Sequence, residues 1–105
     1  MAKRPRTEAE LNDAWIGDAV LALHARVKIL REHGRIDAPS AASMTSNQFL
    51  SAAGEPTTVE AAIGRVYLDR GLLAAFDHID SRLTPLFERQ LANRLRGTTS
   101  ASQRK

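Results

Sequence analysis

The chain has 105 residues, of which 43% are hydrophobic and 26% charged, enough for one domain with a modest core. It contains no cysteine, which excludes disulfides and zinc–thiolate sites and fits a cytoplasmic location. No stretch resembles a membrane span or a secretory signal, so we expect no membrane partner. The net charge of +3 favours polyanionic partners such as nucleic acid, although it also fits plain solubility.

Few aromatic residues and many alanines favour an all-α fold. We expect residues 1–6 to form a basic disordered arm. Thr7-Glu8-Ala9-Glu10 has the form of a capping box, and apolar residues then recur every three or four positions. This pattern predicts a helix of about 25 residues that ends at His33-Gly34.

Glycine, proline and serines in residues 34–44 predict a loop there, followed by a short helix at 45–53 with Phe49 and Leu50 facing the core. After a break at 54–56, a helix is expected to open at Thr57 and to end at Gly71.

The last predicted helix runs from Leu72 to about Arg96. Proline is tolerated mainly in the first turn of a helix, so Thr84-Pro85 predicts a kink or a restart. Residues 7–96 are therefore expected to form one helical domain, and residues 97–105 a disordered tail.

The first informative motif, Trp15-Ile16-Gly17-Asp18-Ala19-Val20-Leu21, lies within the long predicted helix. Glycine costs about 1 kcal/mol relative to alanine inside a helix, and aspartate is also a poor helix former there. Two unfavourable residues side by side among large apolar ones indicate a functional site. The alternative is an aspartate at the edge of the apolar face, paired with an arginine.

The second motif is Glu60-Ala61-Ala62-Ile63-Gly64-Arg65-Val66-Tyr67-Leu68-Asp69-Arg70-Gly71-Leu72. Its small residues at 61, 62 and 64 allow another helix to approach closely. Taken alone, Glu60 is better explained as a first-turn glutamate that interacts favourably with the helix dipole.

Together, the two motifs resemble the signatures of the ribonuclease III family. In that family an aromatic–aliphatic–Gly-Asp stretch precedes a Glu-Ala-x-x-Gly helix that ends in Tyr-Leu-Asp-x-Gly-Leu. The intervening Ser46-Asn47-Gln48-Phe49-Leu50 is also similar to a family element. The similarity runs from about residue 8 to 90, covers only the catalytic domain, and is closest to the Mini-ribonuclease III branch, with a shortened middle. It implies an all-α, ribonuclease III-like helical bundle that forms a homodimer.

The resemblance further implies that Asp18 and Glu60 are catalytic and bind a divalent metal. Carboxylates suit Mg²⁺, with Mn²⁺ as a substitute, and such a metal activates water for attack on a phosphate. The implied activity is an endoribonuclease in RNA processing that hydrolyses double-stranded or structured RNA to 5′-phosphate and 3′-hydroxyl ends. No histidine is assigned to this site.

The chain also departs from the family. Leu11, Ala14 and Thr57 occupy positions where the larger enzymes carry additional carboxylates. Asp13 does not replace them, because it lies about 140° around the helix from Asp18. A basic arm that helps related enzymes to grip RNA is missing as well, which places RNA affinity and cleavage efficiency in doubt.

Two surfaces are expected to serve binding. An RNA duplex is recognised largely through its phosphates, shape and 2′-hydroxyls, so the contacts should depend strongly on salt. The predicted contacts are Arg26, Lys28, Arg31, Arg35 and Arg65, although each also fits a solvated charge. By the resemblance, the first-motif helices pair across a two-fold axis through Leu11, Trp15 and Ile16. The alternative is that Trp15 packs within its own subunit.

Two other functions stay open. The missing carboxylates and basic arm would fit a catalytically weak or inactive ribonuclease III-like RNA-binding protein of a ribonucleoprotein. A plain helical interaction protein, whose motifs coincide by chance, would show no effect of divalent metal on its stability.

Overall fold

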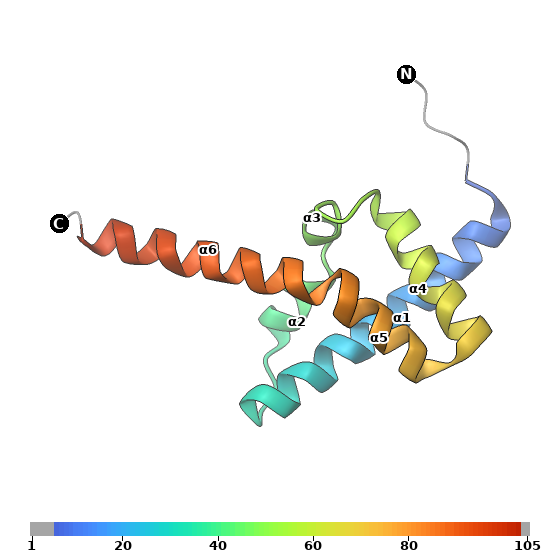
Figure 1. Ribbon diagram of the computed structural model, residues 1–105, viewed down its shortest axis with the longest axis horizontal. Helices are drawn as coiled ribbons and strands as arrows, with labels where there is room; N and C mark the ends of the chain where they lie inside the picture. The colour runs from blue at the N-terminus through green and yellow to red at the C-terminus, as the bar shows by residue number, and fades with distance from the viewer. Residues whose placement is uncertain (1–5, 104–105) are drawn as a thin grey trace, which may run out of the picture.

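The computed structural model describes the backbone of residues 6–103 and the side chains of residues 6–93. Within this part the regular elements are all helices, which confirms the predicted all-α class. They are α1 (Glu8–His33), α2 (Ala38–Thr45), α3 (Asn47–Leu50), α4 (Pro56–Arg70), α5 (Leu72–Arg82) and α6 (Thr84–Gln103). α1 runs through the body of the molecule and α6 extends away from it (Figure 1). None of the described helices is long and apolar enough to cross a membrane.

The two ends of α1 follow the predicted signals. The Thr7 side chain accepts a hydrogen bond from the backbone N–H of Glu10 at 3.0 Å, which satisfies one of the free donors at the start of the helix. Gly34 adopts a left-handed conformation with φ 70° and donates its N–H to the carbonyl of Leu30 at 2.9 Å. The prediction of a long helix over this range is therefore confirmed.

The predicted loop at residues 34–44 is wrong in its second half, because α2 occupies Ala38–Thr45. Asp37 caps this helix by accepting hydrogen bonds from the backbone N–H and the hydroxyl of Ser40, at 3.1 Å and 2.8 Å. Pro39 lies in the first turn, where a missing N–H costs nothing. The proline that indicated a break thus marks the start of a helix.

The next two helices are close to expectation. The helix predicted at 45–53 is shorter, at Asn47–Leu50, with Ser46 as its cap, and it buries Phe49 and Leu50 as predicted. α4 begins one residue before the predicted start because Pro56 is its first residue. Glu55 caps it by accepting a hydrogen bond from the N–H of Thr57 at 2.8 Å.

The predicted restart at Thr84-Pro85 is confirmed, since α5 ends at Arg82 and α6 begins at Thr84. The helical backbone of α6 continues to Gln103, so it extends beyond the predicted end at Arg96 and through most of the predicted tail. Residues 1–5 of the predicted arm and residues 104–105 lie outside the described part.

The buried apolar side chains form two clusters that follow one another along α1. The larger joins Val20 and Leu21 of α1 to residues of α3, α4 and α5, and the smaller joins Ala25 and Ile29 to Met44 of α2. Phe87 of α6 packs against both clusters. Because both clusters use α1, this helix is held along much of its length and can present its polar residues in fixed positions.

Candidate active site

The candidate site is built on the crossing of α1 and α4, where the two backbones touch (Figure 1). A Cβ atom added to Gly17 would lie 1.8 Å from the carbonyl oxygen of Glu60. One added to Gly64 would lie 1.9 Å from the carbonyl oxygen of Asp13. Neither position has room for a side chain. The two glycines that are costly within their own helices therefore allow the helices to approach more closely than any other residue would permit.

The crossing brings Asp18 and Glu60 together, although they are far apart in the chain. Their carboxyl groups form a hydrogen bond, and the pKa of Glu60 is raised from 4.5 to about 8. The causes are the burial of Glu60 first, then the hydrogen bond and the negative charge of Asp18, and finally the charge of Glu55. Glu60 is half-buried and Asp18 is exposed. At pH 7 the Glu60 carboxyl thus keeps its proton.

This arrangement suits a small cation better than a proton at higher pH. Two carboxylates at one exposed edge offer oxygen ligands of the kind Mg²⁺ prefers, while leaving positions for water and for a substrate phosphate. Among the described residues there is no group of three or more His, Asp or Glu side chains that could hold a metal. The donor set fits a weakly held Mg²⁺ more than a tightly bound structural ion.

Glu55 is an acidic neighbour that sequence reasoning did not single out. Its carboxylate caps α4 and forms an ion pair with Arg6 at 2.6 Å. The hydrogen bond from the Thr57 backbone and the hydrogen bond from Arg6 lower its pKa to about 2. Glu55 is therefore charged and already engaged, and it acts on Glu60 through its field. A glutamate directly before a proline at a helix start was the available signal.

On the other flank of the crossing, Arg65 forms an ion pair with Asp13 at 2.7 Å. The Asp13 side chain is only 13% exposed, whereas that of Arg65 is 58% exposed. Arg65 was predicted to contact RNA. The structure instead gives its guanidinium a partner from α1, so it does not provide a free positive charge.

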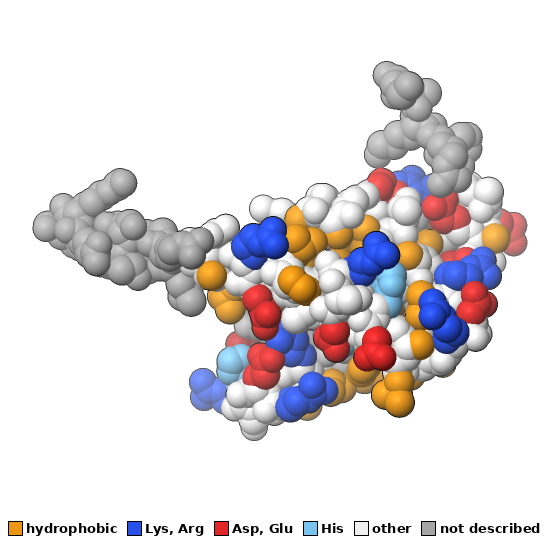
Figure 2. Space-filling view, in the orientation of Figure 1, with side chains coloured by type: hydrophobic (Ala, Val, Ile, Leu, Met, Phe, Trp, Pro, Cys, Tyr) orange, Lys and Arg blue, Asp and Glu red, His pale blue; other side chains and the backbone are white. Residues whose placement is uncertain are grey.

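The other predicted RNA contacts fall into two groups. Lys28 is ion-paired with Glu32 at 2.5 Å and with Glu88 at 3.5 Å, and its side chain is only 12% exposed. Burial opposes its charge, but the hydrogen bonds and charges of the two glutamates outweigh this and raise its pKa. By contrast, Arg26, Arg31 and Arg35 are exposed. Figure 2 shows acidic and basic side chains intermixed on the face in view.

The predicted dimer residues also divide. Trp15 is 79% exposed and Leu11 is 50% exposed, one turn apart on α1. This excludes the alternative that Trp15 packs within its own subunit. Ile16 is partly buried and packs against the larger core cluster. Of the three, Leu11 and Trp15 are therefore placed to meet a partner with at least half of their surface.

His24, the histidine nearest to Asp18 in the chain, has a structural role. It is buried, and its Nε2 lies 2.8 Å from Oδ1 of Asp80 on α5. Its ring packs edge-on against Phe76, with ring centroids 5.0 Å apart. These contacts tie α1 to α5 and leave His24 outside the candidate site, in line with its omission from the predicted ligands.

The chain was compared with known protein families, curated proteins and solved structures. No known family profile, curated protein or solved structure matches the chain.

Proposed function

We propose that the chain is a metal-dependent endoribonuclease of the ribonuclease III type, acting on double-stranded RNA. The observation that carries the proposal is the contact between Asp18 and Glu60 across the glycine crossing. Two ionised carboxyl groups held close together are unfavourable for stability, and acidic groups with a strongly shifted pKa are concentrated at functional sites. The residues in contact are those that the family motifs assign to metal binding.

In this proposal, Asp18 and Glu60 hold Mg²⁺ through one carboxylate each. When bound, the metal supplies Lewis acidity to the scissile phosphate and favours the ionisation of water. The half-buried Glu60 must release its proton to bind, so activity should rise as pH approaches 8. The exposed position of Asp18 leaves its side open to a bulky polyanion. The expected products carry 5′-phosphate and 3′-hydroxyl ends.

The RNA surface in this proposal uses the exposed arginines of the α1 end. Arg31 and Arg35 lie at the end of α1 and in the loop after it, and Arg26 lies one turn and a half before Arg31. Arg31 is 13 positions from Asp18, or about 20 Å along the helix. Contacts at that distance would position a duplex by its phosphates and would weaken with salt.

We further propose a homodimer in which Leu11 and Trp15 of each copy are covered. Two large apolar side chains exposed one turn apart leave a patch that association would remove from water. Trp15→Ser should shift the sedimentation coefficient towards that of the monomer, while Leu73→Ser, at another exposed leucine, should not. A wild-type chain that sediments as a monomer at high concentration would remove this part of the proposal.

Cleavage of a labelled RNA duplex tests the activity directly. With Mg²⁺ or Mn²⁺, the wild-type protein should cut the duplex but not a single strand of the same sequence. Asp18→Asn and Glu60→Gln should each slow cleavage by at least about 100-fold, because each removes a metal ligand. Asp69→Asn, at an exposed carboxylate of the same helix, should stay within about twofold. Cleavage that persists in both site variants would remove Asp18 and Glu60 from the mechanism.

A second candidate is a ribonuclease III-like RNA-binding protein without catalysis. It is favoured by the small acidic set, since no third carboxylate joins Asp18 and Glu60 in a metal-binding group among the described residues. This candidate predicts salt-dependent duplex binding with no cleavage under either metal. Glu60→Gln should then bind RNA as well as the wild type.

A further inference from the structure

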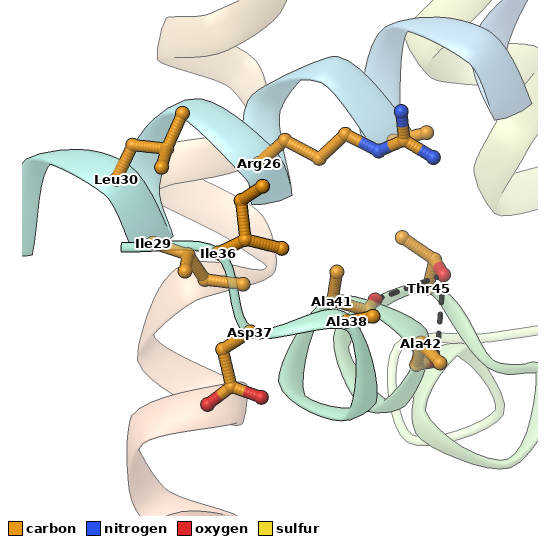
Figure 3. A pocket seen from close by; sticks show the side chains of 10 residues that line it. Arg26, Ile29, Leu30, Ile36, Asp37, Ala38, Ala41, Ala42 and Thr45 are labelled. Carbon is orange, nitrogen blue, oxygen red and sulfur yellow. Dashed lines mark hydrogen bonds between the residues drawn. The ribbon is translucent and has the colours of Figure 1, made fainter. Parts of the chain in front are cut away.

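A concave site lies beside α1, away from the Asp18–Glu60 pair. It is a pocket of about 490 Å³ between the C-terminal half of α1, the following loop and α2 (Figure 3). This volume falls within the range of about 300–1,000 Å³ that is typical of small-molecule sites. Its lining comprises Ala22, Arg26, Ile29, Leu30, Ile36, Asp37, Ala38, Ala41, Ala42 and Thr45.

The walls of this α1–α2 pocket are apolar and are kept open by small residues. Four alanines line it, and their short side chains leave space between the helices. Ile36 projects between α1 and α2 in Figure 3. It is 84% exposed, and Leu30 is 50% exposed. A ligand in the pocket would cover apolar surface that now faces water, which favours an apolar body.

The polar groups of the pocket differ in whether they are already used. The Asp37 carboxylate is held by Ser40 and points away from the pocket in Figure 3. The Thr45 hydroxyl lies 3.1 Å from the carbonyl oxygen of Ala41, to which it donates a hydrogen bond. Arg26 extends along α1 towards Thr45, and no hydrogen bond or ion pair joins it to any other described residue. The available polar group is thus a guanidinium.

We infer that the α1–α2 pocket binds a small organic anion, with its apolar body against Ile29, Leu30 and Ile36 and its anionic group on Arg26. An unpaired guanidinium beside an apolar wall favours a carboxylate, sulfonate or phosphate and disfavours a cation. Neither Asp18 nor Glu60 lines this pocket. The inference goes beyond the proposed nuclease activity and does not depend on it.

Fluorescence titration with a matched pair of probes tests the site. The anionic probe is 1-anilinonaphthalene-8-sulfonate, and the uncharged one is N-phenyl-1-naphthylamine. Arg26→Gln should weaken binding of the anion by about tenfold, because it removes a charge-assisted hydrogen bond, and should change the neutral probe by less than about twofold. Arg31→Gln, which removes an exposed arginine outside the pocket, should leave both unchanged. Equal anion binding by Arg26→Gln and the wild type would overturn the inference.

A blocking variant tests the location independently. Ala42→Trp fills the pocket from an exposed position on α2, and far-ultraviolet circular dichroism checks that the fold is kept. Both probes should lose binding in this variant, and unchanged binding would place them elsewhere. If the probe is instead released as the wild-type chain self-associates in sedimentation runs, a second copy covers the pocket and the small-molecule assignment is wrong. No RNA or metal is present, so these results are separate from those of the cleavage test.

Discussion

The two flanks of the α1–α4 crossing differ in the charges that they bring together. On one flank, Asp13 of α1 meets Arg65 of α4, and the two charges neutralise each other at 2.7 Å. On the other flank, Asp18 of α1 meets Glu60 of α4, and two acids face each other. Both pairs are held by the same backbone contact at Gly17 and Gly64.

This difference shows on which flank the acidic side chain is already neutralised by another described side chain. The Asp13–Arg65 pair needs no further ion, since each charge has its partner. Among the described residues no cation is paired with Asp18 or Glu60, so within this part a proton or an added cation has to neutralise the pair. Crossing geometry alone does not distinguish the flanks, whereas the signs of their charges do. The acidic flank is therefore the one that should respond to pH and to divalent metal.

The largest expected effect comes from breaking the crossing itself. Gly17→Ala would place a methyl group 1.8 Å from the carbonyl oxygen of Glu60, so the helices would have to move apart. Because backbone atoms cannot yield as a flexible side chain can, we expect a loss of about 3 kcal/mol or more in the free energy of unfolding. Urea denaturation measures it.

Gly34→Ala is the matched control for this substitution. Nothing lies within 4 Å of an added Cβ there, but φ is 70°, so the cost is about 1 kcal/mol of backbone strain. Equal losses for the two variants would mean that α1 and α4 are not in backbone contact in solution.

The next effect separates the flanks by pH. The pKa of Glu60 is raised to about 8 in the folded chain, against 4.5 as its ordinary value, so folding favours the protonated form. This contribution to stability is fully present below about pH 4.5, declines as pH rises, and is lost by about pH 8. Because Glu60 is only half-buried, solvent screening limits the effect to about 1 kcal/mol, or roughly 5 °C in the melting temperature.

Thermal melting at several pH values, with and without Mg²⁺, measures this effect. Mg²⁺ competes with a proton for Glu60, and fewer Glu60 carboxyls carry a proton at pH 8 than at pH 6. Mg²⁺ should therefore raise the melting temperature more at pH 8. Glu60→Gln keeps a neutral hydrogen-bonding side chain, so its melting temperature should vary less with pH and should not respond to Mg²⁺. A variant that still responds like the wild type would assign the effect to other groups.

The smallest effect concerns the opposite flank. Arg65→Gln removes an ion pair that is largely exposed on the arginine side, so we expect a loss of at most about 1 kcal/mol. Since Arg65 is already paired, duplex affinity and its salt dependence should change little. Urea denaturation and a salt series of RNA binding measure both. If Arg65→Gln lost more RNA affinity than Arg31→Gln, Arg65 would contact RNA as the sequence predicted.

Local signals were sufficient to predict much of the helical layout. Thr7, Gly34 and Pro85 act through the hydrogen bonds and dihedral angles of their immediate neighbours, and those effects do not need a partner helix. The prediction at Pro39 was wrong because proline occurs both just after helix ends and in the first turn of helices. Its meaning depended on Asp37, whose side chain caps α2.

The meeting of Asp18 with Glu60 was implied by the resemblance to the ribonuclease III motifs, and the glycine in each motif explains how the two helices approach so closely. The partners of Arg65 and Lys28 were not predictable in this way. Arg65 meets a residue 52 positions away, and Lys28 meets Glu88 of another helix. Such pairs depend on how the helices pack, and one sequence holds no periodic signal for them. Ile16, which was predicted at the dimer contact, packs against the larger core cluster.

The close approach at Gly17 and Gly64 has a consequence for how robust the acidic flank is. Main-chain atoms, rather than the shapes of packed side chains, set the separation of the two helices there. Truncating a distant core residue such as Met44 should thus lower the melting temperature while leaving the Mg²⁺ dissociation constant nearly the same. The chain can therefore accept substitutions in its core without changing the distance between Asp18 and Glu60.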